Sequence, residues 1–376
     1  MSMVMERESR NPDPVSNGEG RRPGRLHRRR RLIACVLRTG ARPARDRAML
    51  RTISLGLALM ALPGVAGAQA TAPDYAVVHG WPTLPPGYML GQATGVGIDS
   101  ANRVYVFQRA GRTWTDPFPT GLIRGPTIVV FDGDSGTVVD TWGGDRFVMP
   151  HGLEVDADDN IWVTDVGLHQ VFKLSPEGEV LMVLGEAGVP GDDLTHFNRP
   201  TDVAVAPDGT VYISDGYENS RVLKFAADGR PLLQWGERGT GPGQFDLPHA
   251  IDLDAQGRVY VADRENDRVQ VFDADGRFLT QWKSEGLGRP YGVAVAPGAD
   301  FALVVDGGEQ PDSPPDRSGA AVVGLDGTLL QRFGAFGPQD GQFRLAHDGV
   351  IGRDGALYIV DALGERVQKF TPRRAR

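Results

Sequence analysis

The chain has 376 residues, a formal net charge of −8 and 40% hydrophobic residues, which is enough apolar material for a large core. Residues 1–68 contain 14 arginines and 5 acidic residues, and without them the charge falls to −17. A remainder this acidic argues against binding to nucleic acid or to an anionic membrane surface. The only cysteine, Cys35, lies in the removed part, so no disulfide can form in residues 69–376.

The first 68 residues divide into two segments. Residues 1–48 hold 13 arginines without repeats or apolar periodicity, and they are either a basic arm or a stretch upstream of a true start at Met49. The second reading is favoured, because an export signal rarely begins at residue 49. Residues 49–68 predict a secretory signal peptide, with Arg51 before an apolar run and Ala66-Gly-Ala68 before the cleavage point. We therefore expect a secreted or periplasmic protein without a membrane span.

Residues 73–372 contain six copies of one pattern, each of four short strands separated by turns rich in Gly, Asp and Asn. Such strands predict an all-β six-bladed β-propeller, and a monomer is expected. The sixth copy ends on its third strand, so YAVVHGW at residues 75–81 is expected to close the ring. The second strand of five copies ends on an aspartate, which we interpret as a turn cap. These residues are Asp165, Asp215, Asp263, Asp306 and Asp361.

Three histidines stand at the same position in alternate copies of the repeat. His151, His249 and His347 are separated by 98 residues each, in MPHGLEVD, LPHAIDLD and LAHDGVIG. The intervening copies carry other residues there, namely Thr94, Thr201 and Tyr291. Around a ring axis the three imidazoles would face one another, and three neutral imidazoles hold a catalytic Zn²⁺ with one open position. A single such histidine is more often a strand-end hydrogen bonder, but the threefold recurrence favours metal binding.

Long stretches of residues 86–371 resemble the peptidyl-α-hydroxyglycine α-amidating lyase (peptidylamidoglycolate lyase) family of NHL-type propellers. They include MPHGLEVDADDNIWVTDVGLHQVFKL, HFNRPTDVAVAPDGTVYISDGYENSRVLKF and VYVADRENDRVQVF. The resemblance implies a zinc ion in the central channel and cleavage of the C–N bond of a C-terminal α-hydroxyglycine, which yields an amide and glyoxylate. It places the zinc ligands on the same three histidines, the active-site tyrosine on Tyr217, and two active-site arginines on Arg109 and Arg264. It also implies a structural calcium ion bound by Val96, Leu153 and Asp348.

The chemistry requires a base for the hydroxyl proton and a partner for the substrate carboxylate. Tyr217 can act as the base only if the site lowers its pKa below the usual value near 10. Arg109 and Arg264 both follow a second strand, so they should open onto one face, and which of them binds the carboxylate is left open. Tyr217 could instead be rim packing, and Arg264 could simply pair with the acids of DRENDR.

Two other functions fit parts of the pattern. One is a non-catalytic NHL propeller that binds a peptide or protein and uses the histidines for a structural metal, which would not require Tyr217, Arg109 and Arg264 together. The other is a metal-dependent hydrolase or lactonase, although such propeller sites are generally rich in carboxylate ligands. The leading hypothesis is a secreted zinc-dependent lyase of peptidyl- or acyl-α-hydroxyglycine.

Overall fold

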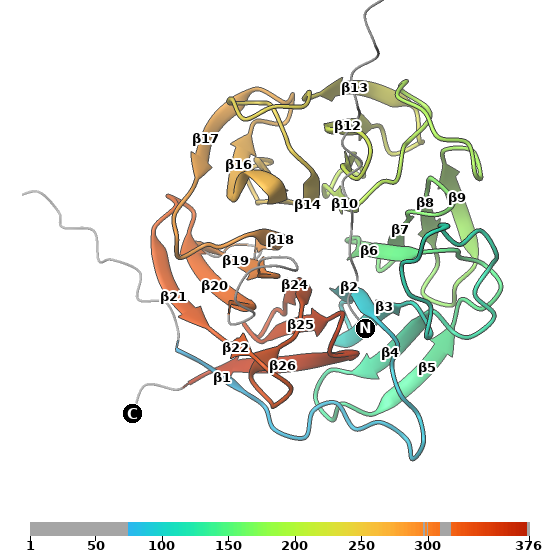
Figure 1. Cartoon of the computed structure of the whole chain (residues 1–376), viewed down its shortest axis with the longest axis vertical. Coiled ribbons are helices and arrows are strands. Elements are labelled where there is room, and N and C mark those ends of the chain that lie inside the picture. Colours follow the sequence, from blue (N-terminus) through green and yellow to red (C-terminus); the bar gives the residue numbers. More distant parts are fainter. Residues whose placement is uncertain (1–73, 296–297, 299, 309–316, 374–376) are drawn as a thin grey trace, which may run out of the picture. The chain divides into compact units, whose positions relative to one another are not determined.

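Six four-stranded antiparallel sheets form a ring in the computed structural model of the chain (Figure 1). The structure describes residues 74–295, 298, 300–308 and 317–373. The arginine-rich segment predicted at residues 1–48 and the signal peptide predicted at residues 49–68 lie outside the described residues. The first strands of neighbouring blades contact one another all the way round the centre. The predicted all-β six-bladed propeller is therefore confirmed.

Each blade runs from a first strand at the centre to a fourth strand at the rim. Blade one is β2 (Ala93–Ile98), β3 (Arg103–Gln108), β4 (Ile128–Asp132) and β5 (Val138–Trp142). Blade two is β6 (Pro150–Val155), β7 (Ile161–Asp165), β8 (Gln170–Leu174) and β9 (Val180–Leu184). Blade three is β10 (Asp202–Val205), β11 (Val211–Asp215), β12 (Arg221–Phe225) and β13 (Pro231–Trp235).

The second half of the ring repeats this order. Blade four is β14 (Pro248–Leu253), β15 (Val259–Asp263), β16 (Arg268–Phe272) and β17 (Phe278–Trp282), with a short 3₁₀ helix η1 (Arg264–Asn266) after β15. Blade five is β18 (Pro290–Val295), β19 (Phe301–Asp306), β20 (Gly319–Gly324) and β21 (Leu329–Phe333). Blade six is β24 (Ala346–Ile351), β25 (Leu357–Asp361), β26 (Arg366–Pro372) and β1 (Tyr75–Val77). A two-stranded pair, β22 (Ala335–Phe336) and β23 (Gln342–Phe343), lies outside the blades.

The N-terminal strand closes the ring, as expected. β1 pairs antiparallel with β26, with Tyr75 opposite Pro372 and Val77 opposite Phe370, so the blue and red ends of the described chain lie side by side in Figure 1. The strand is shorter than the predicted segment of residues 75–81, because the chain turns at Gly80, whose φ is +76°. Trp81 then packs against Tyr358 at 5.1 Å between ring centroids, so its indole fills the space between blades six and one.

The strand-end aspartates cap turns, which confirms their interpretation. Asp165 is fully buried and accepts backbone hydrogen bonds from Val148 and Met149 before its blade, and from Gly167 and Leu168 after its strand. In blade one, Gln108 takes this place and accepts from Gly91 and Ala110 at 2.8 and 2.7 Å. These bonds fix loops that follow the second strands at one face of the ring, and such loops carry Arg109, Tyr217 and Arg264.

The core lies between neighbouring blades. Phe107 and Ile128 of blade one, for example, pack against Ile161 and Val163 of blade two, and all four are fully buried. Each such side chain stabilises the fold by about 1.5–3 kcal/mol. The described part of the chain contains no helix with the length and hydropathy of a membrane-spanning segment.

Candidate metal centre

The three predicted histidines meet at the centre of the ring. His151, His249 and His347 lie near the starts of β6, β14 and β24, and their ring centroids are 4.8, 4.8 and 4.9 Å apart. They are nearly inaccessible, with exposed fractions of 1, 2 and 5%. Alternate blades thus bring side chains from far-apart parts of the chain to one point with near threefold symmetry.

Backbone carbonyls of the following blades orient all three imidazoles. The Nδ1 atoms of His151, His249 and His347 donate to the carbonyl oxygens of Thr201, Tyr291 and Thr94 at 2.6, 2.6 and 2.8 Å. A carbonyl can only accept, so each Nδ1 carries the proton and each Nε2 presents a lone pair.

These Nε2 lone pairs suit a metal ion. The candidate ligand atoms lie within 4.8 Å of one another, and Nε2 of His249 is buried without a hydrogen-bond partner. A metal ion would satisfy that orphaned acceptor, so the residues fit the predicted metal.

The surroundings keep the three imidazoles neutral. Burial is the largest cause and lowers the pKa of His151 and His249 well below the usual value, and that of His347 to about 3. The positive charge of Arg264 lowers all three pKa values further, and that of Arg109 lowers the pKa values of His151 and His347. Neutral imidazole is the form that binds a metal ion, so the ligands need no deprotonation at neutral pH.

Tyr217 lies directly on this centre. It follows β11 by two residues, and its Oη lies 2.9 Å from Nε2 of His151, to which the phenol donates. Trp114 packs against its ring at 5.0 Å between centroids. Burial raises the pKa of Tyr217, whereas Arg264 and Arg109 lower it. The two guanidinium groups alone therefore do not produce the lowered pKa that a role as base requires.

Arg109 is a buried cation without an acidic partner in the described part of the chain. It follows β3 and is 6% exposed. Its Nε donates to the carbonyl of Pro150 at 3.1 Å, and its Nη1 donates to Oε1 of Gln92 at 2.9 Å. Burial lowers the pKa of Arg109. A buried guanidinium held only by neutral acceptors is prepared to receive an anion from outside the protein.

Arg264 has a carboxylate beside it. Its Nε and Nη2 donate to one oxygen of Glu265 at 3.1 and 3.0 Å, and Glu265 also pairs with Arg289. Its guanidinium carbon lies 5.8 Å from the ring centroid of Tyr217. The pairing with a neighbouring acid considered from the sequence is therefore present, but Arg264 also faces the centre.

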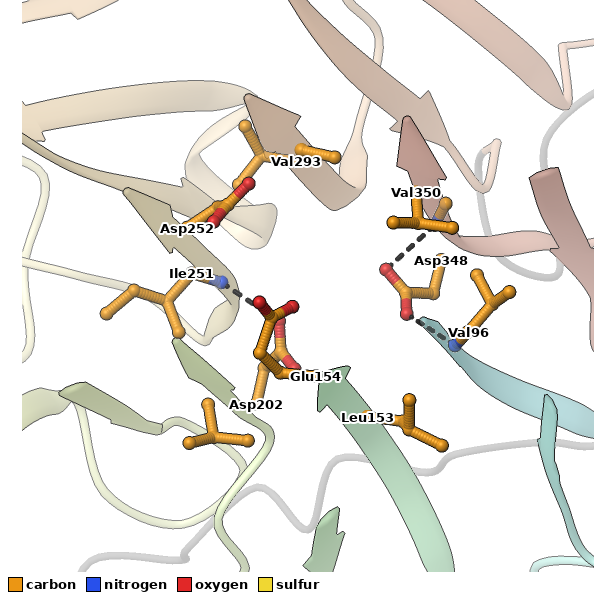
Figure 2. A pocket seen from close by; sticks show the side chains of 12 residues that line it. Val96, Leu153, Glu154, Asp202, Ile251, Asp252, Val293, Asp348 and Val350 are labelled. Carbon is orange, nitrogen blue, oxygen red and sulfur yellow. Dashed lines mark hydrogen bonds between the residues drawn. The ribbon is translucent and has the colours of Figure 1, made fainter. Parts of the chain in front are cut away.

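Four carboxylates line a pocket in the ring together with the residues expected to hold calcium (Figure 2). Asp348, Val96 and Leu153 are all there, and Asp348 accepts a hydrogen bond from the backbone N–H of Val96 at 3.0 Å. The other three acids, Glu154, Asp202 and Asp252, were not predicted from the sequence. Each lies one or three residues beyond the histidine position of its repeat, and because the offset differs between repeats the sequence carries only a weak signal for them.

Burial raises the pKa of all four carboxyl groups, to about 7 for Asp252 and Asp348 and well above the usual value for Glu154 and Asp202. Backbone donors oppose the shift at Asp202, Asp252 and Asp348. Asp202 is buried and the other three acids are partly exposed, and carboxyl groups gathered in this way keep protons or are neutralised by a cation. Oxygen ligands of this kind suit Ca²⁺.

Comparisons with known proteins agree with the repeat pattern. The NHL repeat family model matches residues 147–174, 197–225 and 245–272. The chain is 38% identical over 314 residues to a peptidyl-glycine alpha-amidating monooxygenase B of Xenopus laevis, covering 78% of this chain and 35% of that protein. It is 34% identical over 327 residues to a peptidyl-alpha-hydroxyglycine alpha-amidating lyase 1 of Drosophila melanogaster, covering 80% of this chain and 60% of that protein.

Solved structures support the fold alone. A gluconolactonase of Xanthomonas campestris has a TM-score of 0.53 and 17% identity, over 75% of this chain and 86% of that chain. Three of the sequence relatives are named as peptidyl-alpha-hydroxyglycine alpha-amidating lyases, and they match 80, 48 and 52% of this chain. The chain spans 60% of the Drosophila lyase and 35% of the Xenopus monooxygenase, and it is a relative of the peptidyl-α-hydroxyglycine α-amidating lyases that carries NHL repeats.

Proposed function

We propose that the protein is a zinc-dependent lyase that cleaves the C–N bond of a peptidyl- or acyl-α-hydroxyglycine to give an amide and glyoxylate. The observation that carries the proposal is the centre itself, where three oriented neutral imidazoles lie beside Tyr217 and two buried arginines. The relatives named amidating lyases support the same reaction. An all-nitrogen set of three ligands suits zinc.

The reaction needs one proton to move and one bond to break. When bound, zinc polarises the substrate hydroxyl and lowers the pKa of groups beside it. Tyr217 accepts the hydroxyl proton at Oη, the O–H electron pair becomes the carbonyl bond of glyoxylate, and the C–N bond breaks. The amide nitrogen keeps the electron pair of the broken C–N bond and receives a proton, for which Oη of Tyr217 is the available donor.

The two arginines divide the remaining work. Arg109 has no acidic partner among the described residues, so we assign it to the substrate carboxylate, which an arginine can bind through two parallel hydrogen bonds. Arg264 is already paired with Glu265, and its charge beside Tyr217 favours the phenolate form. Neither role is needed for a structural metal, which argues against the non-catalytic alternative.

We further propose that the pocket of Asp348, Val96 and Leu153 holds a structural calcium ion. The raised pKa values of its carboxyl groups support a bound cation there. Secretion to the outside or the periplasm, and a monomeric state, remain proposals from the sequence. The peptide nature of the substrate is supported by the names of the relatives.

The direct test is glyoxylate release by residues 69–376 from a synthetic N-acyl-α-hydroxyglycine, with the amide product identified by mass spectrometry. The matched N-acylglycine, which lacks the hydroxyl, should release nothing. A folded protein that holds zinc at the three histidines and releases no glyoxylate would contradict the proposal.

A further inference from the structure

One residue breaks the symmetry of the centre. At the repeat position of the three histidines, the other blades carry Thr94, Thr201 and Tyr291. The hydroxyl groups of Thr94 and Thr201 donate hydrogen bonds to the carbonyls of Pro150 and Pro248 at 3.2 and 2.8 Å. Both side chains are small compared with that of a tyrosine. Tyr291 differs because it places an aromatic ring beside the imidazoles.

The ring of Tyr291 fills the gap between two of the histidines. Its centroid lies 4.8 Å from that of His249 and 5.7 Å from that of His347, and the residue is 4% exposed. Gly307 packs against the ring so closely that an added Cβ would lie 2.3 Å from Cδ2 of Tyr291. The absence of a side chain at Gly307 therefore makes room for the ring of Tyr291.

Arg264 lies over this ring. Its guanidinium carbon is 4.7 Å from the ring centroid of Tyr291, closer than its 5.8 Å distance to the ring of Tyr217. Glu265 binds only one edge of the guanidinium group, through Nε and Nη2. Both of these hydrogen bonds end on one oxygen of Glu265, so the ring of Tyr291 supplies a second and separate contact to the guanidinium group. Among the described residues, the Tyr291 hydroxyl has no hydrogen-bond partner.

We propose that Tyr291 is a positioning residue that keeps the guanidinium group of Arg264 beside the three-histidine centre by stacking, and that its hydroxyl is not required. The inference rests on the proposed function for its kinetic consequence. The ring of Tyr291 holds the guanidinium group of Arg264 in place, and the charge of that group favours the phenolate form of Tyr217. Loss of the ring should therefore reduce turnover. Substrate binding should change little, because Arg109 receives the carboxylate.

The kinetic test compares Tyr291→Phe with Tyr291→Leu in glyoxylate release. Tyr291→Phe keeps the stacked ring, so kcat should stay within about 2-fold of the wild type. Tyr291→Leu should lower kcat about 30-fold with KM nearly unchanged, which corresponds to about 2 kcal/mol for a desolvated cation–π contact. Gly307→Ala should shift the ring and lower kcat in the same direction by a smaller factor.

Tyr260 provides a matched control for the effect of losing a buried tyrosine. It is fully buried, carries Arg258 over its ring at 5.8 Å and stacks with Trp282 inside blade four. Tyr260→Leu should lower the melting temperature but leave kcat and KM unchanged at 25 °C. A kcat in Tyr291→Phe as low as in Tyr291→Leu would show that the hydroxyl is needed and overturn the proposal, as would an unchanged kcat in Tyr291→Leu.

A crystal structure of the Tyr291→Leu holoprotein tests the positioning claim without activity. The guanidinium group of Arg264 should be displaced or spread over several conformers, while the three histidines keep their places. A guanidinium group in its original place would overturn the proposal. If the wild type releases no glyoxylate, the proposed function fails, and this structural result still decides the role of Tyr291.

Discussion

Replacement of Asp252 by Asn should stabilise the metal-free protein at alkaline pH. Burial raises the pKa of Asp252 from 3.8 to about 7, so ionising it in the folded state costs about 4 kcal/mol at roughly 1.4 kcal/mol per pKa unit. The carboxylate also accepts backbone hydrogen bonds from Val295 and Leu253, both at 2.6 Å. The amide can keep only one of them, at a cost of about 1 kcal/mol. The net gain expected at pH 8 is therefore about 3 kcal/mol.

The sign of the pH dependence follows from the direction of the shift. Between about pH 4 and pH 7 the unfolded chain has released this proton and the folded protein still holds it, so wild-type stability falls as the pH rises. Above the folded pKa of about 7 the full cost is present. The advantage of Asp252→Asn should hence be large at pH 8 and below about 1 kcal/mol at pH 5.

Added calcium should reverse the order of thermal stability of the wild type and Asp252→Asn. A cation in the pocket neutralises the ionised acids of the wild type, and the variant loses one negative ligand, so added Ca²⁺ should raise the melting temperature of the wild type more. The assay is thermal unfolding of EDTA-treated protein at pH 5 and 8, with and without Ca²⁺. The expected gain corresponds to about 6 °C without metal.

A surface aspartate provides the control for that assay. The pKa of Asp208, which caps a turn at Thr210, is lowered by that backbone hydrogen bond, so Asp208→Asn should give no gain at pH 8. A variant at Asp252 that is less stable than the wild type at pH 8 without metal would refute the reasoning. An equal response of the variant and the wild type to Ca²⁺ would refute the cation site.

Three other substitutions test separate parts of the account. Tyr217→Phe should keep zinc bound but lower kcat about 10²–10⁴-fold, measured by glyoxylate release and metal analysis, because the proton acceptor is lost; near-normal turnover would exclude Tyr217 as the base. Arg109→Gln should raise KM at least 10-fold for acyl-α-hydroxyglycine with a smaller change in kcat, and the opposite split would contradict its assignment to the carboxylate. Asp165→Ala should lower the free energy of unfolding by about 2–4 kcal/mol in denaturant titrations, because it leaves two buried and two partly buried backbone N–H groups without their acceptor.

Repetition explains which parts of the molecule could be predicted from the sequence. The strands and the three histidines recur at fixed positions of the repeat. Because the repeats surround one axis, residues at the same repeat position meet at the centre of the ring. The turn-capping aspartates were predictable for the same reason, and Gln108 was missed as their substitute because its side chain differs.

Other contacts depend on geometry that spacing does not contain. Glu154 and Asp252 lie three residues after the histidine position, whereas Asp202 and Asp348 lie one residue after it, so no single position marks the acidic pocket. The stacking of Arg264 on Tyr291 joins the second-strand loop of blade four to the first strand of blade five. Such a contact follows from how two blades pack and not from either repeat alone.

The central claim is that the three histidines hold a zinc ion on which glyoxylate release depends. The most direct measurement is glyoxylate release by metal-stripped residues 69–376 on titration with Zn²⁺, for the wild type, His249→Ala and the surface control His196→Ala. Activity should saturate at one zinc per chain in the wild type and the control, and His249→Ala should show almost none. Equal activity in His249→Ala, or full activity without metal, would contradict the claim.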